Sequence, residues 1–192
     1  EMKTWMLYLM LMISAGAVVA QSGFQKKAIQ ILPNSQLTIS GDTNINEFEC
    51  QFNTEHLKEH KNLKYSVHNN SISFQNAVLV LNNEDFDCGN KGINRDFKDL
   101  IQADEYPEIT LELNKIELEG KNKARADVTI SIAGLENQYN IPVEIIDNPV
   151  PHFRGTLRIN IKDFELHAPK KVFGLIVVKE DVDVNFNLSV QK

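Results

Sequence analysis

The sequence predicts an all-β dominated domain, a barrel or a sandwich of antiparallel strands, accompanied by one amphipathic helix. Between Ile109 and Val190 five separate runs place an apolar residue at every second position, which is the spacing of a strand with one buried face. The residues that alternate with them are mostly polar, as in antiparallel strands with one face in water. Several such strands in succession are typical of a barrel or a sandwich.

The five runs supply the residues that we expect on the buried face. They are Ile109, Leu111 and Leu113; Ala126, Val128, Ile130 and Ile132; Tyr139, Ile141, Val143 and Ile145; Leu157, Ile159 and Ile161; and Val182, Val184, Phe186, Leu188 and Val190. A barrel removes the free edges of an open sheet, and its apolar face encloses either a packed core or a cavity for a hydrophobic ligand.

Residues 1–20 have the features of a signal peptide. Lys3 supplies a positive charge, Trp5 to Ile13 form an apolar stretch too short to span a membrane, and Ala20 ends a small-residue cleavage site. We therefore expect an exported protein, periplasmic or secreted, with no transmembrane segment in the mature chain. A single domain would run from residue 24 to residue 192.

Composition limits the partners of the mature chain. Removal of residues 1–20 takes away Glu1 and Lys3 and leaves the net charge at −6. Nucleic acid is not expected as a partner, because binding to phosphates depends on clustered Lys and Arg. All methionines lie within residues 1–20, so thioether-ligated copper is excluded as well.

Two cysteines remain, Cys50 and Cys88. In an exported chain an even number of cysteines favours a disulfide. The alternatives are two buried thiols, or a catalytic thiol whose histidine partner the spacing does not identify. Cys50 alternates with Phe48 and Phe52, which predicts a strand with the sulfur on its apolar face.

One helix is predicted, from Asn90 to Ala103. The apolar residues at helical spacing are Ile93, Phe97, Leu100 and Ile101. Asn90 or Asn94 could cap the start of this helix, and Tyr106-Pro107 would end it. A single amphipathic helix among strands is expected to cover an end or a gap of the barrel.

Three segments of the chain resemble those of a known family. They are Asp87-Cys88-Gly89-Asn90-Lys91 through Tyr106-Pro107-Glu108-Ile109-Thr110-Leu111, the stretch from Phe153 to Phe164, and the closing run Val182 to Val190. In this order they resemble the YceI-like family, from about Phe24 to Lys192. The resemblance implies an eight-stranded antiparallel lipocalin-like barrel with a helix packed beside it.

The resemblance also implies a function and a subset of the family. Family members are exported bacterial proteins, and the characterised ones hold a long isoprenoid lipid inside the barrel. The paired cysteines and the Cys-Gly-Asn turn look like the subset typical of Bacteroidetes. Where the family often has Arg-x-Asp-Phe-Gly, this chain has Ile161 and Glu165 around Asp163-Phe164, and an aromatic pair of the helix-to-strand segment is missing. These departures concern head-group recognition rather than the fold.

We predict that the barrel lumen binds a hydrophobic ligand by burial of apolar surface, with few polar groups and no cofactor. The ligand would be an isoprenoid lipid or a quinone. The predicted lining residues are Ile39, Leu111, Leu113, Val128, Ile130, Ile141, Val143, Leu157, Ile159, Val184, Phe186 and Leu188, with Phe173 at the mouth. The alternatives are a structural or interaction barrel with a filled core, and a periplasmic enzyme.

The sequence offers few catalytic or metal-binding candidates. His56 and His60 stand four positions apart beside Glu55 and Glu59, but they could share a metal only in a helix, and a structural zinc site needs four protein ligands. The other histidines are isolated, and no serine or cysteine lies in a nucleophile motif. We therefore expect no metal, and a protein that is not an enzyme.

Intact-mass measurement tests the expected processing. Protein isolated without reductant should begin at Gln21 and have the mass of a chain with Cys50 joined to Cys88. Two free thiols would exclude the disulfide, and a mass that includes residues 1–20 would exclude cleavage of the signal peptide.

Overall fold

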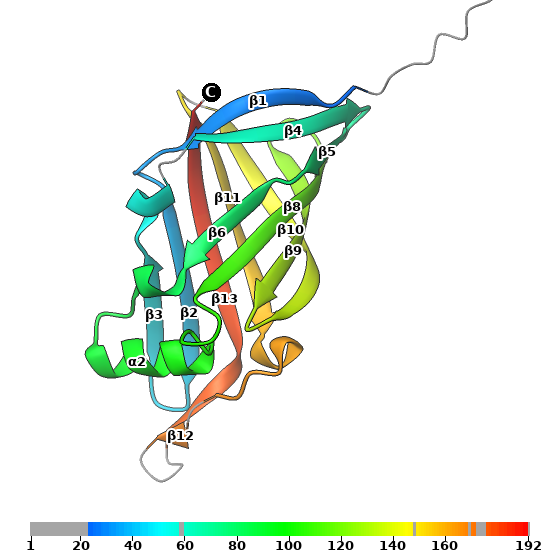
Figure 1. Cartoon of the computed structure of the whole chain (residues 1–192). Helices are drawn as coiled ribbons and strands as arrows, with labels where there is room; N and C mark the ends of the chain where they lie inside the picture. The colour runs from blue at the N-terminus through cyan, green and yellow to red at the C-terminus, as the bar shows by residue number, and fades with distance from the viewer. Residues whose placement is uncertain (1–22, 58–59, 148, 169, 172–175, 192) are drawn as a thin grey trace, which may run out of the picture.

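The computed structural model describes residues 23–57, 60–147, 149–168, 170–171 and 176–191. The strands form an antiparallel sheet that curves into a barrel, with the helix α2 at its lower end (Figure 1). The expected signal peptide and Phe173 lie outside the described residues. In the part of the chain that is described, no helix is long and apolar enough to cross a membrane.

Eight strands close into a ring. Their order around the ring is β1 (Gln25–Ile31), β4 (His60–His68), β5 (Ser71–Gln75), β8 (Glu108–Leu118), β9 (Lys123–Ile132), β10 (Leu135–Asp147), β11 (Pro151–Asn160) and β13 (Ile176–Gln191). The ring closes where β1 pairs with the end of β13, through Gln30 opposite Gln191 and Ile31 opposite Val190. The predicted eight-stranded antiparallel barrel is therefore confirmed.

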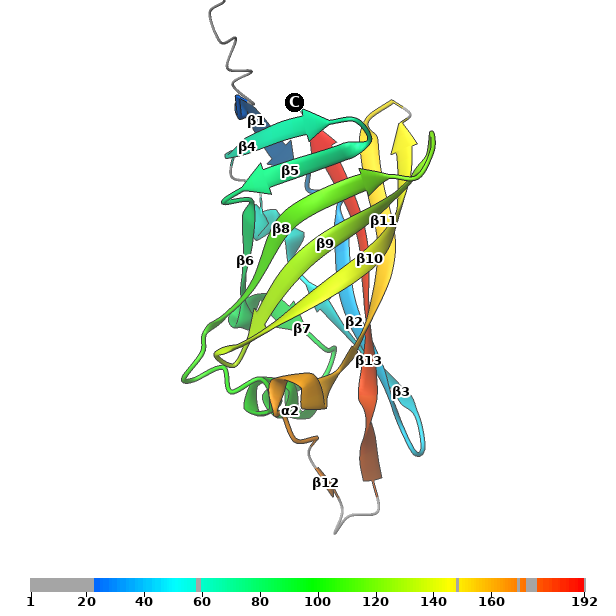
Figure 2. The same ribbon diagram turned by 90° about the vertical axis from the view of Figure 1, so that its right-hand side faces the viewer.

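The lower part of the barrel has a different set of strands. Its additional members are β2 (Gln36–Thr43), β3 (Glu47–Phe52), β6 (Val78–Asn82), β7 (Phe86–Asp87) and β12 (Lys170–Lys171). β2 pairs with β13 below β1, and β6 pairs with β8 below β5 (Figure 2). No pairing joins β3 to β6 among the described residues, so the wall has a seam between these two strands.

The five predicted runs lie in β8, β9, β10, β11 and β13. The prediction for Ile161 is wrong in one respect, because this residue begins the 3-10 helix η3 (Ile161–Phe164) instead of extending β11. The side chain of Asn160 accepts a hydrogen bond from the backbone N–H of Lys162 at 3.0 Å. This local cap competes with continuation of the strand, although Ile161 remains in the core.

A β-bulge in β8 changes which residues face inward. Leu113 pairs with Val128 and Lys115 pairs with Asp127, so that Asn114 is the extra residue. An extra residue shifts the two-residue alternation by one position. Ile116, rather than Lys115, therefore packs against the core.

The helix α2 (Lys91–Leu100) begins where the sequence predicted. The side chain of Asn90 caps it by accepting from the backbone N–H of Gly92 at 2.7 Å. The predicted end at Ala103 is wrong, because Gln102 takes a left-handed conformation with φ 55°. Hydrogen bonds from Ala103 N to Lys98 O and from Gln102 N to Asp99 O close the last turn, in the pattern of a Schellman motif.

The apolar side of α2 packs at the seam. Phe97 and Ile101 are buried, and the ring of Phe97 lies 5.1 Å from that of Phe86, which in turn lies 5.0 Å from that of Phe52 on β3. Ile93 was expected on this side, but it is 37% exposed because it lies in the first turn, before the helix reaches the core.

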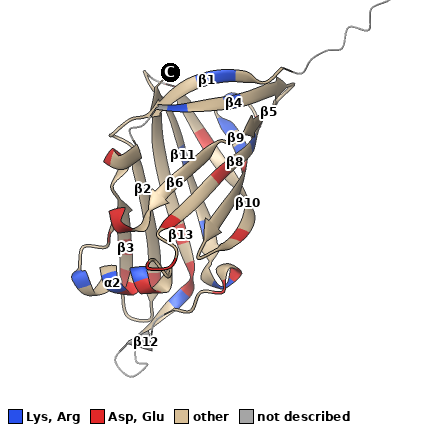
Figure 3. Cartoon of the chain, in the orientation of Figure 1, with Lys and Arg blue, Asp and Glu red and all other residues tan. Residues whose placement is uncertain are grey.

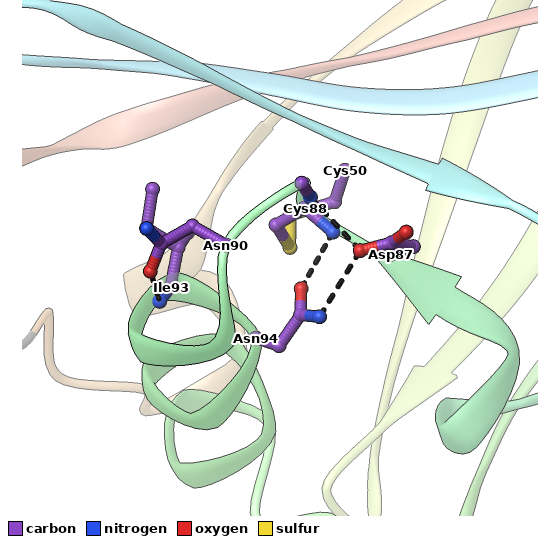
Figure 4. Close-up of a disulfide and its surroundings, with 7 residues drawn as sticks. Cys50, Asp87, Cys88, Asn90, Ile93 and Asn94 are labelled. Atoms are coloured by element: carbon purple, nitrogen blue, oxygen red, sulfur yellow. Dashed lines mark hydrogen bonds between the residues drawn. A yellow bond between two sulfur atoms is a disulfide. The ribbon is translucent and has the colours of Figure 1, made fainter.

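A disulfide between Cys50 on β3 and Cys88, just before α2, ties the helix to the seam (Figure 4). Asn94 reinforces the tie: its Oδ1 accepts from the backbone N–H of Cys88 at 2.6 Å, and its Nδ2 donates to Asp87 Oδ1 at 3.0 Å. The bond from Asn94, followed by one from the backbone N–H of Gly89, lowers the pKa of Asp87. Asp87 thus makes a turn contact with the backbone of Gly89, at 2.9 Å.

Removal of the disulfide should destabilise the fold without changing its topology. The disulfide closes a loop between two residues that are 38 positions apart. For a loop of this length, the chain-entropy model predicts that the double variant Cys50→Ala and Cys88→Ala loses about 4 kcal/mol in the free energy of unfolding. Asn94→Ala, which removes only hydrogen bonds, should cost about 1–2 kcal/mol. Urea unfolding measures both losses, and equal losses for the two variants would contradict this account.

Candidate ligand-binding site

The candidate site is the apolar interior of the barrel. All the predicted lining residues that the structure describes belong to one hydrophobic cluster. Its buried members are Val128, Ile130, Ile141, Leu157 and Ile159, and the partly buried residues that pack against them are Ile39, Leu111, Leu113, Val143, Val184, Phe186 and Leu188. Phe173, predicted at the mouth, lies outside the described residues. Contact of these side chains with a ligand stays a prediction.

Strand register brings the lining residues together across the sheet. Leu111 lies opposite Ile130 in the pairing of β8 with β9. Val184 lies opposite Leu157 on one side and opposite Ile39 on the other. Because residues directly opposite in neighbouring strands point to the same face, the separate runs of the sequence form one continuous apolar surface.

Two glycines leave room for aromatic rings on this inner surface. A Cβ at Gly155 would lie 2.5 Å from the ring of Phe186 and 2.7 Å from the carbonyl oxygen of Pro142. Similarly, a Cβ at Gly41 would lie 2.6 Å from the ring of Phe48. In each pair the glycine lies opposite the phenylalanine in the neighbouring strand, so each ring packs directly against a glycine backbone.

The sequence interpretation missed several residues of the interior. They are Ile31, Leu37, Leu79, Leu81 and Ile116. Leu79 and Leu81 lie in the uninterrupted apolar segment Val78–Leu81, where alternation is hidden because the outward residues are also apolar. Ile116 was missed because the bulge at Asn114 reverses the alternation after Leu113. In the sequence, such a bulge is visible only as a shift of the apolar residues from odd to even positions, or the reverse, within one strand.

The helix α2 and the 3-10 helix η3 lie at the lower end of the barrel (Figures 1 and 2), and both contribute buried side chains to the apolar core. Phe164 of η3 is 1% exposed, and its ring stacks with that of Tyr139 at 6.3 Å. The hydroxyl of Tyr139 lies 3.3 Å from Asp163 Oδ2. Burial, together with the charge of Asp163, raises the pKa of Tyr139 to about 12, so this phenol remains neutral at physiological pH.

Basic and acidic residues are interspersed along the strands (Figure 3). Arg158 on β11 makes two hydrogen bonds to Asp183 on β13, at 2.8 and 2.9 Å. These bonds to Arg158 lower the pKa of Asp183. Arg154 on β11 pairs with Glu144 on β10 at 2.6 Å. The sheet thus separates a charged exterior from the apolar interior.

The two histidine candidates lie in different elements. His56 lies in the 3-10 helix η1 (Thr54–Leu57), with Nδ1 2.7 Å from Asp85 Oδ1, whereas His60 begins β4. The two residues therefore do not share a helix, and Glu59 lies outside the described residues. Over the described ranges no group of three His, Cys, Asp or Glu side chains could hold a metal ion.

His152 is isolated in the sequence, but in the fold it has a partner. Its Nδ1 lies 2.9 Å from the hydroxyl of Ser189 on the neighbouring strand. Ser189 is 0% exposed, so this hydroxyl is not accessible to a substrate. The pair is therefore part of the wall, and it does not form a nucleophile site.

Comparisons with known proteins agree with this architecture. The sequence profile of the YceI-like domain matches residues 34–190. Among solved structures, BcnA from Burkholderia cenocepacia is similar with a TM-score of 0.62 and 21% identity, over 82% of this chain and 96% of BcnA. A polyisoprenoid binding domain from Saccharophagus degradans has a TM-score of 0.59 and 14% identity, over 85% of this chain and 97% of that domain.

A YceI protein from Campylobacter jejuni is also similar, with a TM-score of 0.51 and 19% identity, over 62% of this chain and 74% of that protein. A search of curated protein sequences gave no match. At these identities the solved structures show the fold alone. The domain profile, however, covers most of the chain, including α2 and the barrel strands from β2 to β13. The chain therefore belongs to the YceI-like domain family.

Proposed function

We propose that this protein is an exported carrier or binding protein that holds a hydrophobic chain, such as an isoprenoid lipid, in the lumen of its barrel. The observation that carries the proposal is the continuous apolar surface inside a closed ring of strands. Membership of the YceI-like family and the similarity to a polyisoprenoid binding domain support it.

The energetics of burial favour a long ligand. Each buried CH₂ contributes about 0.8 kcal/mol, so about ten such groups supply the roughly 8 kcal/mol of a micromolar complex. Association costs at least about 4 kcal/mol in lost freedom of motion. A chain of several isoprene units meets both requirements, whereas a short apolar molecule does not.

Binding rather than catalysis is proposed because the charged side chains and the lining residues lie on opposite faces of the sheet. Arg158, Asp183 and Arg154 make their ion pairs on the outer face, away from Leu157 and Val184 on the inner face. Export is proposed from residues 1–20, and the disulfide supports it because such bonds persist in oxidising compartments.

Native mass spectrometry of the protein purified from its own host tests the proposal. A bound mass in the isoprenoid range, released by organic solvent, is the expected result. Protein that carries no extractable lipid, and that takes up none when polyprenol is added, would instead indicate a structural barrel with a filled core.

Two substitutions should separate the lumen from the outer face. Val143→Asp and Leu157→Asp place a carboxylate among apolar neighbours, where an unpaired charge costs several kcal/mol to desolvate. We expect lipid retention to fall at least about tenfold, since roughly 1.4 kcal/mol suffices for that factor. Extraction and quantification of lipid from equal amounts of protein measures this.

Thr156→Asp is the matched control, because Thr156 is exposed on the outer side of β11, next to Leu157. This variant should keep its lipid. Each variant must retain a cooperative thermal transition, so that lost binding is not mistaken for unfolding. Unchanged lipid content in folded Val143→Asp and Leu157→Asp proteins would contradict the lumen site.

A further inference from the structure

One buried polar atom at the lower end of the interior has no partner. The polar residues that are buried in the described part of the chain are Ser35, Thr54, Asn83 and Ser189. Ser35 bonds to both of its polar neighbours: its Oγ accepts from Ser189 N at 3.0 Å, and its carbonyl oxygen accepts from Thr54 Oγ1 at 2.9 Å. Asn83, in contrast, is 1% exposed, and its Oδ1 has no hydrogen-bond partner among the described residues.

The orientation of the Asn83 side chain follows from its other bonds. Its Nδ2 donates to the carbonyl oxygen of Tyr106 at 2.7 Å, and its backbone N–H donates to the carbonyl oxygen of Pro107 at 2.9 Å. If the amide were turned over, Oδ1 would face the Tyr106 carbonyl, and two acceptors would meet. The unpartnered atom is therefore the oxygen, an acceptor, and the side chain is held in place.

The alternation of β6 places the side chain of Asn83 on the inward side of the wall. On β6 the inward residues are Leu79 and Leu81, and the outward residue Asn82 is exposed. Asn83 comes next on the inward side as the first residue of the 3-10 helix η2 (Asn83–Asp85), and the following core residue is Phe86. β6 runs down toward α2 (Figure 1), so Asn83 lies near the closed end of the apolar interior.

We propose that Asn83 Oδ1 is the acceptor for the head group of the bound lipid, and that this head group is a neutral hydrogen-bond donor, an alcohol or a quinol. The inference rests on the proposed function and names its ligand class. Burial of Asn83 Oδ1 without a partner raises the free energy of the free protein. A hydroxyl group that enters with an apolar chain can donate a hydrogen bond to this oxygen. The polar end therefore enters first, toward α2, and the chain follows between the strands.

The same atom discriminates against other head groups. A phosphate is an anion that would meet a carbonyl oxygen, and none of the buried residues that the structure describes is Lys or Arg. An oxidised quinone presents only acceptors, so it makes no bond to Oδ1. Specificity arises because a donor head group pairs the buried oxygen, whereas a head group without a donor leaves it unpaired.

Competition between three probes tests the inference in the full mature protein: a polyprenol, its methyl ether and its monophosphate, all with the same chain. The polyprenol should bind about tenfold more tightly than the ether, which corresponds to roughly 1.4 kcal/mol, and more tightly than the monophosphate. In Asn83→Ala the polyprenol and the ether should bind with affinities within about twofold of each other, as expected when only the hydrogen bond has been removed.

Asn187 supplies the matched control. Its Oδ1 is also buried without a partner among the described residues, but it alternates with the inward residues Phe186 and Leu188 of β13 and so belongs to the outer side. Asn187→Ala should keep the wild-type preference for the alcohol.

The wild-type comparison decides the inference even if Asn83→Ala does not fold. Equal affinity of the wild-type protein for polyprenol and ether, or tighter binding of the monophosphate, would overturn the role of Asn83 while leaving the carrier function intact. Failure of all three probes to bind would overturn the proposed function itself, and this inference with it.

Discussion

Closure of the barrel depends on the change of partner that β13 makes at Ser189. Below this residue one edge of β13 pairs with β2, and above it the same edge pairs with β1. At the junction the turn between β1 and β2 supplies the missing bonds: Leu32 N donates to Ser189 O at 2.9 Å, and Ser35 Oγ accepts from Ser189 N at 3.0 Å. A buried backbone group left unpaired there would cost free energy. The side chain of Ser35 therefore allows the long strand β13 to pair with β2 and then with β1 along the same edge.

This exchange of partners produces the difference between the two parts of the barrel. In the upper part, backbone pairing through β1, β4 and β5 completes the ring. In the lower part, β6 and the short pair of β3 with β7 leave edges, and an exposed edge can pair with other chains. In this part, side-chain contacts and a covalent bond take the place of backbone hydrogen bonds between strands. The contacts are those between the rings of Phe52, Phe86 and Phe97, and the covalent bond is the disulfide between Cys50 and Cys88. The two cysteines thus stand where the backbone alone does not close the wall.

Sequence patterns predicted the second half of the barrel better than the first, and the reason is physical. β9, β10 and β13 each have one face in the core and one in water, so their apolar residues alternate clearly. β1 and β4 contribute little to the core, and Ile31 is the one buried residue among those of their side chains that the structure describes. Their sequences are accordingly mixed and polar. The bulge at Asn114 and the left-handed turn at Gln102 depend on backbone geometry, which periodicity does not report.

The structure explains the two departures from the family pattern around Asp163-Phe164 by the backbone conformation of Glu165 and the burial of Ile161. Glu165 stands where the family often has glycine, and its φ is 54°, a conformation that glycine adopts at lower cost. Its backbone N–H bonds to Lys162 O at 3.0 Å to end η3, so the turn is kept although the residue differs. Ile161 stands where the family often has arginine, and it is 4% exposed, in the core. A guanidinium at that place would bring a positive charge to the lower end of the interior. With isoleucine there, the buried residues that the structure describes at this end offer an amide oxygen at Asn83 and no Lys or Arg, which suits an uncharged donor better than an anion.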